Sequence, residues 1–201
     1  MANSAWIHAV FTFNNTSKAN FGNDVEEVVG IYLGRLSKDK GVADLIAALP
    51  AVFDKCSNFS FMFVGPDEDN WVTEISQKLS KYMSRCLIYG YTSTPEKFLA
   101  AADFLVLPSY REGFGSSVVE AGAMGVPAIV SDIYGLRDAA VPTTSLSFSV
   151  GCVSQLTDVM IEIILNTSLR LDLSNKAYER TINFFDSRIL VCELESFYEK
   201  L

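Results

Sequence analysis

The chain has 201 residues, a formal net charge of -8 and an apolar fraction of nearly one half. Its length suffices for one good-sized hydrophobic core but is short for two full domains. Because acidic residues are in excess and no basic patch stands out, the sequence argues against a general nucleic-acid-binding protein. The apolar residues form short scattered runs, and none of them approaches the length of a membrane span.

The cysteines are typical of a protein from a reducing compartment. Cys56, Cys86, Cys152 and Cys192 are dispersed, form no C-x-x-C pair and lie among apolar neighbours. These features favour buried reduced thiols over metal ligands or disulfides. The N-terminus lacks the basic start and apolar block of a secretory signal peptide. We therefore expect a cytoplasmic protein.

The first part of the chain, residues 1–26, is polar and rich in asparagine. Apart from a short mixed run at 6–13, it shows no sustained periodicity. We predict a linker or a frayed leading strand here rather than a domain.

From residue 28 onward, short apolar runs alternate with amphipathic stretches. The apolar runs predict strands at 28–33, 59–64, 86–89, 103–107, 128–131 and 146–150. The amphipathic stretches predict helices at about 42–53, 71–84, 95–102, 117–124, 154–165, 168–185 and 187–200. Pro50 should kink the first of these helices or mark its end.

This alternation predicts an α/β protein with a single Rossmann-like, doubly wound parallel sheet of about six strands and helices on both faces. Ligands of such sheets bind at the carboxyl ends of the strands, where the connecting loops converge. The segments that follow the strands are therefore the first candidates for a site.

The first candidate segment, residues 34–41, follows the first strand and reads Gly-Arg-Leu-Ser-Lys-Asp-Lys-Gly. Arg35 can bind two phosphate oxygens at once, and Lys40 adds a second positive charge. Gly34 allows the backbone to approach a ligand closely, and the following helix start offers unpaired N–H groups. The alternative is an ordinary solvated charged turn, and the spacing alone favours neither reading.

The second candidate segment, residues 109–127, begins after an apolar run and contains two carboxylates, Glu112 and Glu120. Between them lies a flexible Gly-Phe-Gly loop, and the serine pair that follows it offers caps for a helix ending near Gly125. A strand, a glycine-bearing loop and a helix N-terminus in this order build an anion site in open α/β sheets.

Several residues of the second segment have competing explanations. Ser117-Val-Val-Glu120 fits the capping box, in which the glutamate turns back to the start of its own helix. Alternatively, Glu120 accepts hydrogen bonds from paired hydroxyls such as those of a ribose, each worth about 1.5–3 kcal/mol. Phe114 can fill the edge of the core while its glycine neighbours face a ligand. Glu112 caps nothing obvious, which makes it the stronger functional candidate of the two carboxylates.

Together these residues resemble the C-terminal, nucleotide-sugar-binding domain of a GT-B glycosyltransferase of the retaining family four (glycosyl transferases group 1). The resemblance is close over about residues 28–138 and looser in the C-terminal helices. Its motifs are Gly-Arg-Leu-x-x-x-Lys-Gly at 34–41, Phe-Val-Gly at 63–65, Ala-Ala-Asp at 101–103, Leu-Pro-Ser at 107–109, Glu-Gly-Phe-Gly at 112–115, Glu-Ala at 120–121 and Gly-Val-Pro at 125–127. The ordered set, rather than any one tripeptide, carries the resemblance.

The resemblance implies a site for a nucleotide-diphosphate sugar, with no metal and no other cofactor. Arg35 and Lys40 would hold the donor diphosphate and stabilise it as it leaves, and Glu112 would contact hydroxyls of the donor sugar; these three would be the catalytic residues. Glu120 would bind the ribose. The remaining implied donor-binding residues are Gly34, Gly113, Phe114, Gly115, Ser116 and Ser117, together with Gly90 and Tyr91 near the base.

The implied reaction is transfer of a sugar to an acceptor hydroxyl with retained configuration, in the synthesis of a cell-surface polysaccharide or glycolipid. A GT-B enzyme also needs an N-terminal domain that binds the acceptor and closes the cleft. We expect residues 27–185 to form the nucleotide-sugar domain and 186–201 a helix that would return to a missing or separate acceptor domain. The chain alone should bind donor but transfer little or nothing, and any peripheral membrane association would come through the absent half.

The chain departs from the family pattern at two places. A serine pair, Ser116-Ser117, stands where bulky apolar residues are usual, and Gly122 stands where methionine is common; both changes affect the expected sugar pocket. A second hypothesis is a non-catalytic nucleotide-sugar-binding module that works only with a separate acceptor-domain partner. A third, ranked last, is another α/β enzyme such as a GT-B-fold epimerase or phosphorylase.

Overall fold

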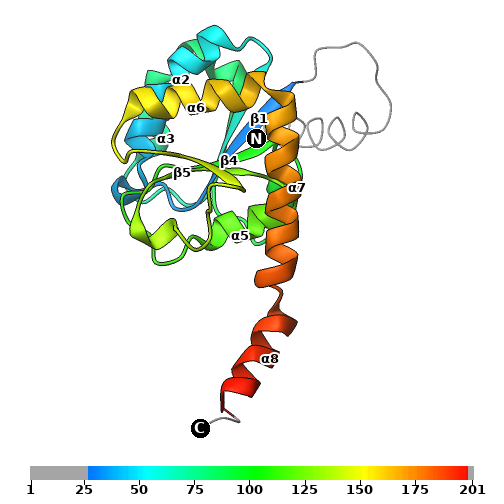
Figure 1. Cartoon of the computed structure of the whole chain (residues 1–201). Helices are drawn as coiled ribbons and strands as arrows, with labels where there is room; N and C mark the ends of the chain where they lie inside the picture. Colours follow the sequence, from blue (N-terminus) through cyan, green and yellow to red (C-terminus); the bar gives the residue numbers. More distant parts are fainter. Residues whose placement is uncertain (1–26, 199–201) are drawn as a thin grey trace.

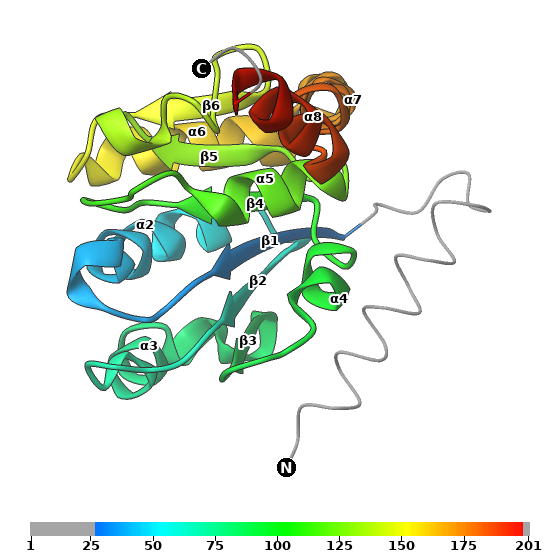
Figure 2. The same ribbon diagram turned by 90° about the horizontal axis from the view of Figure 1, so that it is seen from below.

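The computed structural model describes residues 27–198, so the predicted leading segment at 1–26 lies outside the described residues. The described chain contains one parallel sheet with the strand order β3-β2-β1-β4-β5-β6 (Figures 1 and 2). Its strands are β1 (Val28–Leu33), β2 (Phe59–Val64), β3 (Cys86–Tyr89), β4 (Phe104–Leu107), β5 (Ala128–Ser131) and β6 (Ser145–Phe148). The predicted α/β class with a single Rossmann-like sheet is confirmed.

Helices cover both faces of this sheet (Figure 2). The α-helices are α2 (Val42–Lys55), α3 (Trp71–Lys78), α4 (Pro95–Leu99), α5 (Ser116–Ala123), α6 (Val153–Leu165), α7 (Thr167–Phe184) and α8 (Ser187–Tyr198). Short 3-10 helices are η1 (Lys38–Lys40), η2 (Ser80–Arg85) and η3 (Tyr134–Leu136). Buried residues of α2 and α6 pack in one core, and those of α4 and α5 pack in the other, so the sheet is covered on each side.

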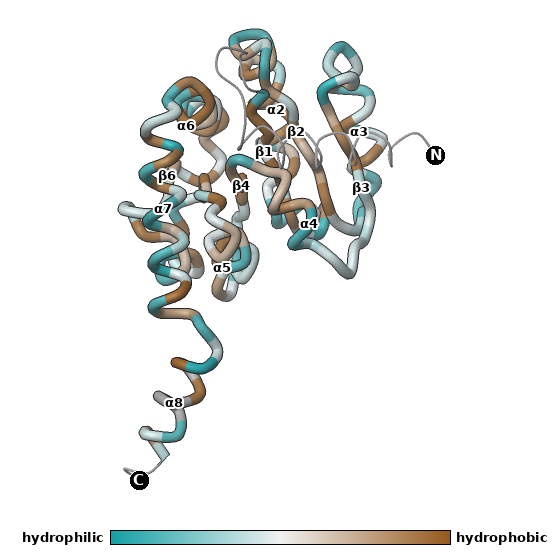
Figure 3. The backbone as a smooth tube through the Cα atoms, turned by 90° about the vertical axis from the view of Figure 1, so that its right-hand side faces the viewer, coloured by the Kyte–Doolittle hydropathy of each residue, from teal (hydrophilic) through white to brown (hydrophobic). Residues whose placement is uncertain are grey.

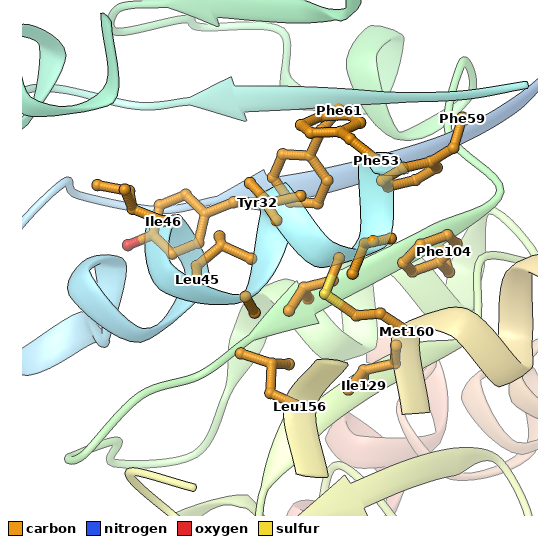
Figure 4. Packing of buried hydrophobic residues seen from close by; sticks show 14 of the residues in the cluster. Tyr32, Leu45, Ile46, Phe53, Phe59, Phe61, Phe104, Ile129, Leu156 and Met160 are labelled. Carbon is orange, nitrogen blue, oxygen red and sulfur yellow. The ribbon is translucent and has the colours of Figure 1, made fainter. Parts of the chain in front are cut away.

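The central strands supply side chains to both cores because successive residues of a strand point to opposite faces. On β2, Phe59, Phe61 and Phe63 all enter the core that α2 and α6 share, and all three are fully buried. Figure 4 shows Phe59 and Phe61 in this core. The ring of Phe59 stacks on that of Phe104 with centroids 5.8 Å apart. Each such burial contributes about 1.5–3 kcal/mol to the hydrophobic stabilisation of the sheet.

One helix prediction differs from the structure, and another loses one of its two alternatives, the end of the helix at Pro50. Pro50 does not end the first helix, because α2 runs through it to Lys55. Proline removes one backbone hydrogen bond from a helix interior, but the buried side chains of Val52 and Phe53 beyond it keep the last turn packed on the core. The helix predicted at 71–84 is divided into α3 and η2, which meet at the buried Leu79.

The sequence predicted buried, reduced cysteines, and among the described cysteines the structure confirms burial for Cys56 alone. Cys56 is buried and Cys86 is half-buried, and burial raises the pKa of the Cys86 thiol to about 12. Cys152 is also half-buried, and its hydrogen bond with the Ser154 hydroxyl lowers its pKa. These three thiols are free, as predicted, whereas the side chain of Cys192 lies outside the described residues.

The last two helices differ in their contacts with the sheet. α7 packs on α5, where a Cβ placed on Gly122 would come within 2.3 Å of the Thr181 hydroxyl, so glycine permits this close approach. α8 extends away from the body of the domain (Figures 1 and 3). Among the helices of the described chain, none combines the length and apolar character needed to cross a membrane.

Candidate functional site

The loops that follow β1, β2, β3 and β4 meet at one edge of the sheet and line a cavity of about 740 Å³. This volume falls within the range of small-molecule sites, about 300–1,000 Å³. The predicted residues that line it are Gly34, Arg35, Lys40, Tyr91, Glu112, Gly113, Phe114, Gly115, Ser116, Ser117 and Glu120. Gly90 directly precedes Tyr91 and is the one predicted residue outside the lining.

Arg35 is held at the cavity through its backbone. The buried hydroxyl of Tyr32 donates to the Arg35 carbonyl at 2.5 Å. Burial, reinforced by the nearby charges of Glu112 and Asp39, raises the pKa of Tyr32, so this phenol stays protonated and remains a donor. The Arg35 side chain is about half exposed, and its Nη1 donates to Oε2 of Glu68 at 2.6 Å.

Lys40 reaches the same cavity from η1 because Gly41 allows two loops to touch. Gly41 has a φ of 69°, and a Cβ there would lie 1.9 Å from the Pro108 carbonyl oxygen. This close approach brings Lys40 Nζ to 2.8 Å from Oε1 of Glu112. The two side chains are only 15% and 14% exposed, so the pair is far less screened by water than a surface ion pair.

Glu112 is fixed from several sides. Its Oε1 also accepts from the hydroxyl of the buried Ser109 at 2.8 Å, and the Ser131 hydroxyl in turn donates to the Ser109 carbonyl. On the other side, η3 lies against the backbone of Glu112, since a Cβ on Gly135 would come within 1.8 Å of the Glu112 carbonyl oxygen. The carboxylate of Glu112 is therefore oriented by Lys40 and Ser109, and its backbone by η3, which follows a different strand.

The N-terminus of α5 differs from the predicted capping arrangement. Gly115, with a φ of 81°, is the N-cap, so Ser116 and Ser117 are the first two residues of the helix and not its caps. No side-chain hydrogen bond caps this end of α5, so the Ser117–Glu120 capping box is not formed. Because a glycine in the left-handed conformation starts the helix earlier, Glu120 is free to line the cavity, where burial raises the pKa of its carboxyl group.

The start of α5 makes this part of the cavity favourable for an anion. The first N–H groups of a helix lack partners within the helix, and the helix dipole places partial positive charge there. Ser116 and Ser117 carry two of these groups at the cavity wall. With Arg35 and Lys40, they form three sources of positive potential around one space.

Phe114 does not fill the core edge as predicted. Its side chain is 41% exposed, and its ring meets the ring of Phe185 edge-on with centroids 5.7 Å apart. Phe185 lies between α7 and α8, and the guanidinium of Arg180 stands 5.5 Å from its ring centroid. Phe114 therefore packs against the segment that joins α7 and α8.

Other residues of the cavity were not predicted as site residues. Gly65 and Pro66 follow β2, and Thr92 and Pro95 lie in the loop after β3. The rule that carboxyl ends of neighbouring parallel strands share one edge would have found the first pair. A smaller hollow of about 410 Å³ beside β5 and β6 contains none of the predicted residues, and its rim carries an Arg137–Asp132 ion pair at 3.5 Å.

The sequence matches the family model described as Glycosyl transferases group 1 over residues 13–180. The capsular polysaccharide biosynthesis glycosyltransferase CapM of Staphylococcus aureus is 30% identical over 173 residues, which cover 85% of this chain and 45% of CapM. The N-acetyl-alpha-D-glucosaminyl L-malate synthase of Bacillus anthracis is 25% identical, over 90% of this chain and 48% of the relative. The chain thus spans about half the length of these curated relatives.

Solved structures share the fold. Anabaena Alr3699/HepE in complex with UDP-glucose superposes with a TM-score of 0.77 and 22% identity, over 100% of this chain and 54% of that one. The C-terminal domain of the group 1 glycosyl transferase LpcC from Francisella tularensis gives a TM-score of 0.75 with 18% identity, over 88% of this chain and 92% of that domain. At these identities the likeness concerns the architecture.

Proposed function

The chain belongs to the glycosyl transferases group 1 family, and we propose that it acts as the donor-binding domain of a retaining glycosyltransferase. The observation that carries the proposal is the cavity of about 740 Å³ at the carboxyl edge of the sheet, which gathers two cations, a helix N-terminus and two carboxylates. Its substrate would be a nucleotide-diphosphate sugar, and the sugar would pass to an acceptor hydroxyl.

The diphosphate would lie between Arg35, Lys40 and the start of α5. Arg35 offers a planar fork for phosphate oxygens, Lys40 a compact charge, and Ser116 and Ser117 backbone N–H groups. These cations would also stabilise the negative charge that develops on the diphosphate as its bond to the sugar breaks. This electrostatic stabilisation of the leaving group would be the main source of catalysis. No metal is needed in this arrangement, because the side chains and the helix supply the positive charge.

Two carboxylates would recognise the two sugars of the donor. Glu112 lies beside Lys40 with Oε1 engaged by protein donors, so Oε2 would accept from hydroxyls of the transferred sugar. Glu120 points into the cavity one helical turn from Ser116 and would accept from the ribose hydroxyls. The backbone at Gly90 and Tyr91 would meet the base, with Thr92 and Pro95 as further wall residues.

The acceptor would be supplied by a second domain, on the same polypeptide or on a partner protein. The cavity is lined by loops from one edge of one sheet, and α8 extends away from that sheet (Figure 1). We propose that residues 186–201 return to the acceptor domain. The name of CapM, a capsular polysaccharide biosynthesis glycosyltransferase, supports a role in the synthesis of a cell-surface polysaccharide. We propose that the reaction takes place in the cytoplasm and that a glycolipid is the alternative product.

The proposal is tested by titrating the protein calorimetrically with UDP, GDP, ADP and UDP-glucose. At least one should bind saturably, and Arg35→Ala should weaken that binding by about tenfold, since charged hydrogen bonds are worth about 1.5–3 kcal/mol. Arg137→Ala is the matched control, because Arg137 lines the separate smaller hollow. An absence of saturable binding in the whole panel, or equal binding by wild type and Arg35→Ala, would contradict the proposal.

The role of Glu120 predicts a pH-dependent affinity. A carboxylate accepts from both ribose hydroxyls, so the affinity should fall as the pH drops through the pKa of Glu120, which burial raises above its ordinary value of 4.5. UDP-glucose suits this measurement because its diphosphate has no ionisation in that range. Binding to the wild type should therefore weaken as the pH falls from neutral through the pKa of Glu120, because protonation removes the charge that accepts these hydrogen bonds.

Glu120→Gln should bind UDP-glucose more weakly at neutral pH and lose most of this dependence. An equal pH dependence in wild type and Glu120→Gln would assign the titration to another group. Glu74→Gln, an exposed change on α3 outside the cavity lining, serves as the control.

A further inference from the structure

We propose that Glu68 is a specificity-determining residue of this site, whose carboxylate occupies the place on Arg35 that a ligand phosphate takes. The inference rests on the proposed function, and it concerns which ligands the site releases. A phosphate that binds Arg35 must displace Glu68 or accept a neighbouring negative charge. The carboxylate therefore disfavours ligands more strongly as their negative charge increases.

The first observation is the contact itself. Arg35 Nη1 donates to Glu68 Oε2 at 2.6 Å, with the two side chains 51% and 42% exposed. Arg35 lines the cavity, whereas Glu68 is not one of the lining residues and meets the site through its contact with Arg35. Ion pairs with this degree of exposure are weak. A multivalent anion that also gains Lys40 and the start of α5 can therefore replace Glu68 on Arg35.

The second observation is that the backbone keeps Glu68 beside Arg35 even when the ion pair opens. Leu36 N–H donates to the Pro66 carbonyl at 2.8 Å, and Glu68 N–H donates to the Leu36 carbonyl at 3.1 Å. These bonds form a short parallel bridge between the two loops. The backbone of Glu68 therefore stays beside Arg35, and its carboxylate adds negative charge near whatever anion Arg35 holds.

The third observation separates Glu68 from the two aspartates on either side of it. Asp67 accepts from the Trp71 and Val72 N–H groups at the start of α3. Asp69 accepts from the Lys38 N–H at 3.0 Å. Both therefore hold backbone in place, whereas Glu68 directs its carboxylate to a side chain of the cavity.

The consequence concerns the difference between donor and product. A nucleoside diphosphate released after sugar transfer gains an ionisable terminal phosphate, and the second ionisation of a phosphate monoester has a pKa of about 6. Near neutral pH the product thus carries one more negative charge than the nucleotide sugar. A fixed carboxylate beside Arg35 should weaken product binding more than donor binding and so favour product release.

The experiment compares wild type with Glu68→Gln by calorimetric titration with inorganic pyrophosphate, UDP and UDP-glucose. We expect Glu68→Gln to bind pyrophosphate and UDP about two- to fivefold more tightly, the range that weak exposed ion pairs give. UDP-glucose should show a smaller gain. The gains should shrink at high salt, because exposed charges are screened.

Asp172→Asn is the matched control. Asp172 pairs with Lys176 at 2.6 Å on α7, and the two side chains are 54% and 48% exposed. The substitution therefore removes one negative charge from an ion pair as exposed as that of Glu68 with Arg35. It should leave all three affinities unchanged. Equal gains in affinity in Asp172→Asn and Glu68→Gln would show that the effect comes from net charge alone and would overturn the proposal. Unchanged or weaker binding by a Glu68→Gln variant with unaltered thermal unfolding would also overturn it.

A double-mutant cycle locates the effect. If Glu68 acts through Arg35, then Glu68→Gln should bring no gain in an Arg35→Ala background, and a gain that persists there would overturn the proposal. Pyrophosphate makes the outcome independent of the nucleobase. If the protein binds pyrophosphate but no nucleotide, the proposed donor is contradicted, and the comparison of pyrophosphate affinities still tests the role of Glu68. If neither the wild type nor Glu68→Gln binds pyrophosphate, that role is overturned.

Discussion

Lys40→Met is expected to weaken nucleoside diphosphate binding by about 100-fold, the equivalent of one strong charge-assisted hydrogen bond of about 1.5–3 kcal/mol. The effect should exceed that of Arg35→Ala, because Lys40 is 15% exposed and Arg35 is about half exposed. The same change leaves Glu112, itself 14% exposed, without its cationic partner. The free energy of unfolding should therefore fall by about 1–3 kcal/mol, between the values for exposed and fully buried pairs.

The double variant Lys40→Met/Glu112→Gln separates these two effects. Removing both charges relieves the unpaired carboxylate, so denaturant unfolding should recover most of the stability lost in Lys40→Met. Nucleotide binding, measured by titration, should stay weak because the phosphate contact is still missing. Full recovery of binding in the double variant would show that Lys40 only neutralises Glu112 and does not hold phosphate.

Gly135→Ala is expected to displace the Glu112 backbone, which packs against η3. The added Cβ would stand 1.8 Å from the Glu112 carbonyl oxygen, and this neighbour is backbone, so it cannot rotate away. Overpacking of this kind costs about 1–3 kcal/mol. It should also move the Glu112 carboxylate away from Lys40 and lower the affinity for nucleotide sugars, as measured by unfolding and by titration with UDP-glucose.

Gly113→Ala is the matched control for the stability part of this prediction. Gly113 directly follows Glu112 in the loop after β4, but a Cβ there would meet nothing within 4 Å. Its free energy of unfolding should stay within about 0.5 kcal/mol of the wild type, as for most surface substitutions. If Gly135→Ala proved as stable as Gly113→Ala, η3 would not support the Glu112 loop in the way the structure indicates.

Much of the site could be predicted because its positions are tied to strand ends. The motifs at 34–41 and 112–120 follow β1 and β4, and neighbouring parallel strands bring their carboxyl ends to one edge. Hydrophobic runs also located the central strands β1, β2, β4 and β5, since buried parallel strands are apolar on both faces, whereas the edge strands β3 and β6 are only partly buried. These features depend on local sequence and on a general rule of sheet topology.

The sequence by itself therefore determined the α/β class, the strands and eleven of the residues that line the cavity. Tertiary structure alone decided the direction of individual side chains. Phe114 meets Phe185, Lys40 pairs with Glu112, and Arg35 pairs with a carboxylate on the next loop. Such contacts join residues that are far apart in the chain. A local sequence pattern cannot predict them, because it does not determine which distant groups the fold brings next to a side chain.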